Sequence, residues 1–151
     1  MITKEFSSYK DKSAVVYSEE GKIRRKIFKN YIETFKSFMG LNGESESSEG
    51  LYNELLKENL IVKHEIIEEK EDYIVIEPEK VFISYPWEWG FERLKKTALL
   101  VLKIQLLALK HGFTLKDANC YNIQFKGTSP ILIDTTSFEK YVKDSPWVAY
   151  R

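Results

Sequence analysis

The alternation of apolar and polar residues in the first half of the chain indicates a small sheet with two helices. The segments 13–17 and 22–27 flank Gly21 and are typical of two strands joined by a turn. From Ile27 to Met39 they recur at helical spacing, and Gly40 can end that helix. The Gly-, Ser- and Glu-rich run up to Gly50 is predicted to be a loop. The elements expected before residue 86 are strands over 13–17 and 22–27, a helix over 27–39, a helix over 51–56, and extended segments over 61–67, 73–76 and 81–85.

One long helix over 91–111, apolar on most of its surface, dominates the second half. A β-hairpin over 122–126 and 131–134 should follow it, across a turn at 127–130. The proline- and glycine-flanked run 86–90 marks the expected boundary between two parts. We therefore predict an α+β fold. Residues 1–85 would form a small antiparallel sheet with helices, and residues 86–151 a shorter helical part with a catalytic-type loop and the hairpin.

Composition narrows the class of protein. The chain has 151 residues, of which 43% are hydrophobic, so it can build a core. Lys plus Arg and Asp plus Glu both number 23, and this balance suggests neither a nucleic acid nor a membrane surface as a partner. A single Cys120 excludes an internal disulfide, and two distant histidines form no transition-metal cluster. No signal core or bilayer-length apolar segment is visible, so we expect a cytoplasmic protein.

Three oxygen-bearing side chains follow the long helix in an order that suits a metal–phosphate site. Asp117 lies in the loop, Asn122 opens the first hairpin strand, and Asp134 closes the second. Because a hairpin brings its two ends together, Asn122 and Asp134 can converge on one Mg²⁺ ion, which prefers oxygen ligands. Asp117 would then orient a hydroxyl nucleophile. The alternative is that these residues fix turns, since Asp and Asn side chains bond to nearby backbone amides.

A phosphate site also needs a cation, and Arg25 is the candidate. Alternation along the strand over 22–27 places Arg25 on the same face as two isoleucines, pointing inward. An inward arginine needs an anionic partner, and Glu54 on the short helix is the one we expect. The alternative, which we favour from the sequence, is that Arg24, Arg25 and Lys26 form a solvated run on a surface strand.

The tryptophans of the boundary run also have two interpretations. Trp87 and Trp89 could wall a nucleotide base where the two parts meet. Aromatic side chains beside a proline are more often plugs that fill the core next to the following helix, and we expect that role here.

Five short segments, 84–89, 114–118, 121–125, 133–135 and 146–151, carry a resemblance to a known family. They resemble the N-terminal region of a bacterial and archaeal family described as SAM-dependent methyltransferases, including nodulation-type methyltransferases. In that family the methyltransferase domain lies downstream of this region. No Gly-rich turn after a strand offers a SAM site here. The resemblance implies a short member or a fragment that does not bind SAM itself.

The loop and hairpin also resemble the catalytic region of the protein kinase and aminoglycoside phosphotransferase superfamily. This resemblance implies that Asp117 is the catalytic-loop aspartate and that Asn122 and Asp134 bind metal. The departures from the kinase pattern are the lack of a Gly-rich phosphate loop before Lys22, Leu115 in place of the kinase histidine, and Thr135–Thr136 in place of Phe–Gly after Asp134. They weaken the case for an active kinase.

Three functions compete at this point. The first is a kinase-like domain that binds Mg²⁺ and ATP and transfers phosphate. The second is a non-catalytic accessory domain that recognises substrate for, or regulates, a methyltransferase in the same chain or in a partner protein. The third is a methyltransferase acting alone. Self-association is also expected where the helical part exposes apolar surface. An open cleft around the three side chains favours the first function, whereas Asp134 paired with Arg25 or Lys116 favours the second.

Overall fold

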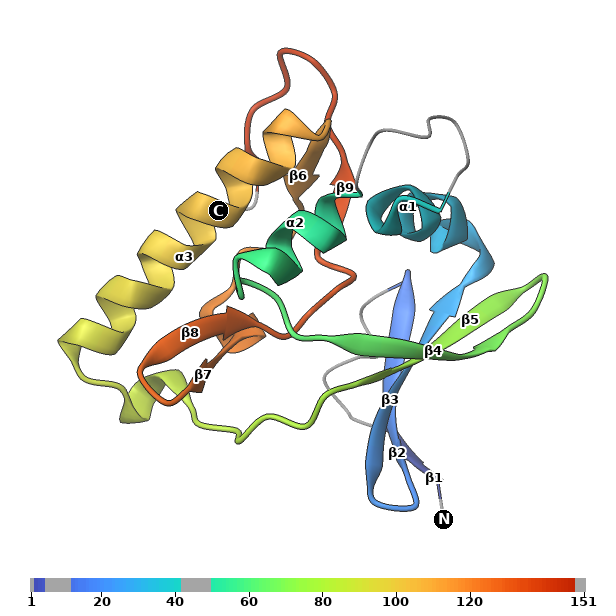
Figure 1. Cartoon of the computed structure of the whole chain (residues 1–151), viewed down its shortest axis with the longest axis horizontal. Coiled ribbons are helices and arrows are strands. Elements are labelled where there is room, and N and C mark those ends of the chain that lie inside the picture. The colour runs from blue at the N-terminus through green and yellow to red at the C-terminus, as the bar shows by residue number, and fades with distance from the viewer. Residues whose placement is uncertain (1, 5–11, 42–49, 149–151) are drawn as a thin grey trace.

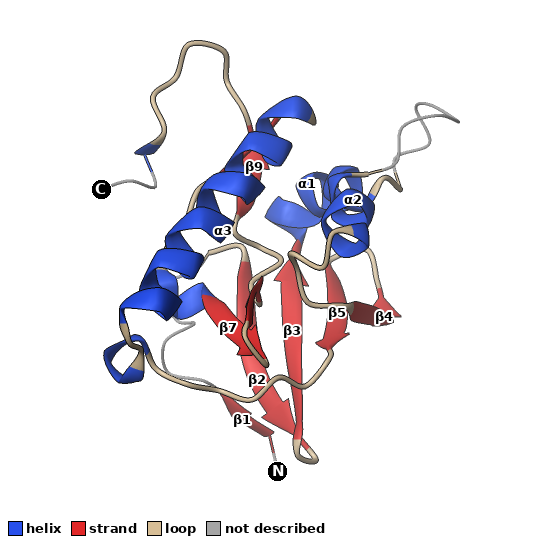
Figure 2. Ribbon diagram, turned by 60° about the vertical axis from the view of Figure 1, so that its left-hand side comes forward, coloured by secondary structure: helices blue, strands red, loops and turns tan. Residues whose placement is uncertain are grey.

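The protein has a mixed α+β fold, seen here in a computed structural model that describes residues 2–4, 12–41 and 50–148 (Figures 1 and 2). The elements are β1 (Ile2–Lys4), β2 (Ala14–Glu19), β3 (Lys22–Phe28), α1 (Lys29–Met39), α2 (Leu51–Lys57), β4 (His64–Glu69), β5 (Tyr73–Pro78), α3 (Phe91–Lys110), β6 (Phe113–Leu115), β7 (Ile123–Lys126), β8 (Ser129–Leu132) and β9 (Phe138–Lys140). Short 3-10 helices cover Pro86–Glu88 and Cys120–Asn122.

Five of the strands form an antiparallel sheet in the order β1-β2-β3-β5-β4. β3 lies at its centre, where Arg25 stands opposite Val16 on one side and Ile76 on the other. α1 follows β3 directly and ends at Gly40, whose φ of 77° is the left-handed conformation that glycine adopts most easily. α2 lies between α1 and α3 (Figure 1).

The second part is tied to the first by backbone hydrogen bonds. The β7–β8 hairpin continues into the first part because Val62 N donates to Leu132 O at 2.8 Å and Leu132 N donates to Leu60 O at 2.9 Å. β6 and β9 form a separate two-stranded sheet after α3. One cluster of buried apolar side chains extends across both parts. The division into 1–85 and 86–151 stays a prediction.

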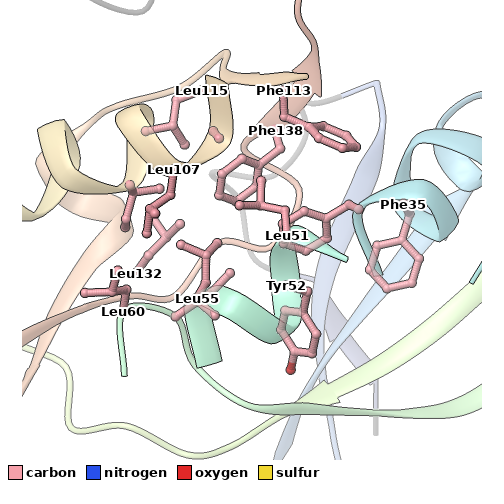
Figure 3. Packing of buried hydrophobic residues seen from close by; sticks show 14 of the residues in the cluster. Phe35, Leu51, Tyr52, Leu55, Leu60, Leu107, Phe113, Leu115, Leu132 and Phe138 are labelled. Carbon is pink, nitrogen blue, oxygen red and sulfur yellow. The ribbon is translucent and has the colours of Figure 1, made fainter. Parts of the chain in front are cut away.

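Aromatic side chains from α1, α2, β6 and β9 pack together in one part of this cluster (Figure 3). Phe38 of α1 is fully buried and stacks on Phe138 of β9, with ring centroids 4.7 Å apart. Its ring also meets Tyr52 of α2 at 5.6 Å and Phe113 of β6 at 6.2 Å. Phe38 therefore joins elements from both ends of the chain.

Most predicted elements are present, with differences at their edges. The strand expected over 61–67 begins at His64, because Ile61 pairs with Leu132 of the hairpin instead. The segment 81–85 is not a strand. The hairpin turn is tighter than expected, since Ser129 and Pro130 pair with β7. Most of the predicted loop before Gly50 lies outside the described residues. Within the described residues, no helix has both the length and the apolar character needed to cross a membrane.

Candidate functional site

Arg25 and Asp134 form an ion pair at the junction of the central strand and the hairpin. The Arg25 guanidinium Nη1 donates to Asp134 Oδ1 and to Thr136 Oγ1. Both charged side chains are largely buried, with 14% and 16% of their surface exposed. The sequence interpretation of Arg25 as part of a solvated run is therefore wrong. The alternation argument that placed its side chain inward is confirmed.

Asp134 receives hydrogen bonds from its own turn as well as from Arg25. The backbone N and the Oγ1 of Thr136 both donate to Oδ1, each at 2.8 Å. Burial pushes the pKa of Asp134 upward, but the Arg25 charge and the Thr136 and Ser137 hydrogen bonds outweigh it, so the pKa lies below the ordinary value. Asp134 is thus ionised and already has its cation.

Ser137 links Asn122 and the backbone of Lys116 to Asp134. Asn122 Nδ2 donates to Ser137 Oγ at 3.4 Å, and Lys116 N donates to Ser137 O at 2.8 Å. Ile133 N donates to Asn122 O, so Asn122 and Asp134 lie at the same end of the hairpin. Sequence reasoning missed Thr136 and Ser137. The signal available was a run of hydroxyl residues directly after Asp134, which the structure shows to be buried.

Asp117 is the most exposed of the predicted site residues. Its Oδ1 accepts from Asn119 N at 2.9 Å, and Asn119 in turn caps the 3-10 helix by accepting from Tyr121 N. These two bonds are the turn-fixing contacts that the alternative interpretation predicted. The catalytic role of Asp117 stays a prediction.

Glu54 does not contact Arg25. Its carboxylate instead pairs with His111 Nε2, at the C-terminal end of α3. The predicted ion pair between Arg25 and Glu54 is therefore wrong, because Arg25 pairs with Asp134. Arg25 is neutralised by Asp134, and Glu54 links α2 to α3. The role of Arg25 and Glu54 in holding a cofactor stays a prediction.

A histidine that the sequence left without a role adjoins Arg25. His64 is 7% exposed, and its ring lies 4.5 Å from Tyr52 and 5.7 Å from Phe35. Neither ring nitrogen has a hydrogen-bond partner among the described residues. Burial and then the nearby Arg25 charge lower the pKa of His64 to about 4. His64 is therefore neutral in the folded protein at neutral pH.

The lowered pKa of His64 makes folding sensitive to acid. Its ordinary pKa of 6.5 applies to the unfolded chain, so between 6.5 and about 4 the unfolded state binds the extra proton. Stability should fall by about 3 kcal/mol from this group as the pH drops through that window. Urea unfolding at neutral pH and near pH 4 measures the free energy of unfolding at each pH. Between these two pH values it should decrease by about 3 kcal/mol less in His64→Phe than in the wild type. An equal loss in both proteins would contradict the assignment.

The two side chains predicted to bind Mg²⁺, Asn122 and Asp134, are engaged with protein groups in this structure. Among the described residues, no group of three or more His, Cys, Asp and Glu side chains lies close enough to hold a metal ion. The Oδ1 of Asp134 is engaged by Arg25 and Thr136, so a metal would require Arg25 to move. Two hollows on the described surface, with volumes of about 590 and 270 Å³, are lined by other residues than Asp117, Asn122 and Asp134.

The two tryptophans of the boundary run differ. Trp89 is buried as predicted, packs edge-on against Phe125 at 5.1 Å, and donates its Nε1 to Ser84 Oγ at 2.9 Å. Trp87 is 69% exposed and stacks on Tyr85 at 4.5 Å, so its prediction as a core plug is wrong. The proline-led 3-10 helix turns these neighbouring aromatic residues in opposite directions.

Comparison with known proteins links part of the chain to one relative. The chain matches no family model. Over 69 residues it is 44% identical to "Nodulation protein NoeA" from Rhizobium meliloti (strain 1021). The match covers 46% of this chain and 14% of that protein, so the chain corresponds to a small part of its relative. The resemblance to nodulation-type proteins is thereby confirmed for that part.

Proposed function

We propose that the protein is a non-catalytic accessory domain that works with a methyltransferase of the nodulation type. The observation that supports it most is the pairing of Asp134 with Arg25, because this pair consumes both charges that a phosphate-transfer site would need. On this proposal the paired Asp134 carboxylate serves the fold and does not bind a metal ion.

The surroundings of the pair support the same function. Thr136 and Ser137 complete the hydrogen bonding of the Asp134 carboxylate from within its own turn. Burial and the Arg25 charge lower the pKa of His64, so this side chain is neutral and offers no second cation for a phosphate. The kinase-type phosphate loop is also missing from the sequence before Lys22.

The comparison adds a setting for such a domain. The matched relative is about seven times longer than the matched segment, since 69 residues are 14% of it. We propose that a segment of this kind positions or regulates the rest of the protein to which it belongs. We propose that the present chain acts on a methyltransferase in the same way, within one polypeptide or between two.

A second candidate is a phosphotransferase that binds Mg²⁺ and ATP. The observation that favours it is the gathering of Asn122, Ser137 and Asp134 at one end of the hairpin, beside the loop of Asp117. Here Asn122 and Asp134 would hold the ion, and Asp117 would accept a proton from a hydroxyl group. It requires Arg25 to leave Asp134 for a phosphate.

Titration calorimetry with Mg²⁺–ATP separates the two candidates. We expect no saturable heat and no rise in melting temperature at millimolar Mg²⁺–ATP, because Arg25 remains with Asp134. Saturable binding that disappears in Asp117→Ala or Asn122→Ala would overturn the accessory function. These two variants are the suitable ones, since neither side chain is part of the buried ion pair and both proteins should fold.

A co-elution experiment tests the accessory function directly. The chain should form a stoichiometric complex with a purified NoeA protein from which the matched 69-residue segment has been deleted, and intact NoeA should bind it less well. Equal or absent binding to both proteins would count against the proposal.

A further inference from the structure

The face of α3 that points away from the core is apolar from Leu99 to Leu109, after the exposed Lys95 in the first half of the helix. α3 buries Leu100, Ile104, Leu107 and Ala108 against the core. On its opposite side, Leu102 is 51% and Leu106 64% exposed. The exposed apolar residues of this face, hereafter the leucine stripe, are Phe91, Leu94, Leu99, Leu102, Leu106 and Leu109. α3 runs along one edge of the molecule in Figure 1, and the side chains of the leucine stripe are 38% to 74% exposed.

The spacing within the leucine stripe is that of a helix–helix seam. Leu99, Leu102, Leu106 and Leu109 are separated by three, four and three positions, which is the repeat by which one helix packs against another. A continuous apolar stripe on an otherwise polar surface marks a site of protein interaction. Its length suits an amphipathic helix lying alongside α3.

A row of lysines borders the leucine stripe. Lys96, Lys103 and Lys110 recur every seven residues, so they fall on one edge of the seam. Lys103 Nζ already reaches Glu58 at 2.6 Å, and Lys96 Nζ donates to Thr128 O at 3.1 Å. The helix as a whole carries five basic residues and only Glu92 as an acidic one. Its electrostatic complement is an acidic partner.

The charge argues against a second copy as the occupant. Pairing α3 with another α3 would bring two strongly basic helices together. In an antiparallel pair the lysine rows would face each other, and like charges at these positions are destabilising. A partner with Glu or Asp beside its own apolar stripe would form ion pairs with the same lysines.

We propose that the leucine stripe of α3 is a docking surface for an amphipathic helix that carries acidic residues on the edges of its apolar face. This deepens the proposed function, on which it rests, because an accessory domain needs a surface that meets its partner. The acidic helix would belong to the methyltransferase protein on which this domain acts.

Two synthetic helical peptides of three heptads test the docking surface. Both carry Leu at the seam positions, and they differ in having Glu or Lys at the flanking positions. The Glu peptide should bind the full chain about tenfold more tightly than the Lys peptide by fluorescence anisotropy, because several flanking ion pairs change sign together. The Leu102→Asp/Leu106→Asp variant should weaken the binding of the Glu peptide by at least about tenfold.

Matched variants keep the result interpretable. Leu102 and Leu106 are exposed, so their double variant should keep the wild-type circular dichroism and melting temperature. Phe82→Asp removes an apolar side chain that is 83% exposed but lies outside α3, and should bind the Glu peptide like wild type. Lys103→Glu/Lys110→Glu should reverse the preference toward the Lys peptide.

Several outcomes would overturn the docking proposal. They are equal binding of both peptides, unchanged binding in the Leu102→Asp/Leu106→Asp variant, a wild-type dimer that this variant dissolves, or variant-sensitive binding to phosphatidylglycerol vesicles without a peptide preference. None of these readouts involves nucleotide. If the two peptides bind equally and calorimetry detects no binding of Mg²⁺–ATP, the docking proposal alone is wrong and the accessory function stands. Saturable Mg²⁺–ATP binding that disappears in Asp117→Ala or Asn122→Ala would remove the accessory function, whichever peptide is preferred.

Discussion

Asp134→Ala is expected to lower the free energy of unfolding by about 3–5 kcal/mol, the usual cost of removing one partner of a buried ion pair. The variant leaves the Arg25 guanidinium largely buried, with Thr136 as its remaining hydrogen-bond partner among the described residues. It also removes the acceptor of both Thr136 hydrogen bonds. Urea unfolding followed by tryptophan fluorescence, with buried Trp89 as a reporter, measures the change.

Arg24 provides the control for this experiment. It is the neighbour of Arg25 on β3 but points to the other face, where it pairs with Glu19 and Glu77 near the surface. Arg24→Met should change stability far less than Asp134→Ala does, because such partly exposed pairs contribute little. The double variant Arg25→Met/Asp134→Leu should regain much of the stability that Asp134→Ala loses, since no unpaired charge remains.

The outcome also bears on function. If Asp134→Ala proved neutral or stabilising, the carboxylate would not be a structural element. A carboxylate that lowers the stability of the protein would then point to a ligand, since functional sites often cost stability. That result would favour the phosphotransferase candidate and would count against the accessory domain.

Phe38→Ala is expected to destabilise the fold by about 3–5 kcal/mol, the range for removing a fully buried aromatic side chain. Phe38 has no exposed surface and contacts rings from α2, β6 and β9. Its removal would leave a cavity, because the surrounding side chains belong to different helices and strands whose backbone hydrogen bonds keep them from moving into the space. Thermal unfolding should show a lower melting temperature together with weakened ring packing in the near-ultraviolet circular dichroism.

Phe82→Ala is the matched change outside the core. Phe82 is 83% exposed, so its truncation should alter stability by no more than about 0.5 kcal/mol. Equal effects of the two substitutions would show that Phe38 does not connect the elements as described.

Local pattern predicts the elements of this chain well and their connections poorly. α1 follows from apolar residues at helical spacing and from Gly40, and α3 from its long apolar run, because both signals lie within one segment. β9 has only three residues and no alternation long enough to recognise. It is stabilised by pairing with β6 and by the ring of Phe138 against Phe38, which are tertiary contacts.

The candidate site shows the same limit. Alternation along β3 correctly turns Arg25 inward, and the hairpin correctly places Asn122 and Asp134 at one end. The partner of Arg25 could not be read from spacing, because Glu54 and Asp134 are both acidic and the choice depends on packing. His64 gave no signal either, since its burial arises from rings on α1 and α2.

The separation of the residues that close this fold has a consequence for how the protein is made. Arg25 and Asp134 are 109 positions apart, and the hydroxyl of Tyr31 meets the carbonyl of Phe138 across 107 positions. Ribosomes deliver the N-terminal strands first, so Arg25 must wait until Asp134 has been translated before it meets its counter-charge. The sheet therefore emerges with a buried arginine that is still unpaired, and the hairpin that carries Asp134 decides when this part of the molecule reaches its native state.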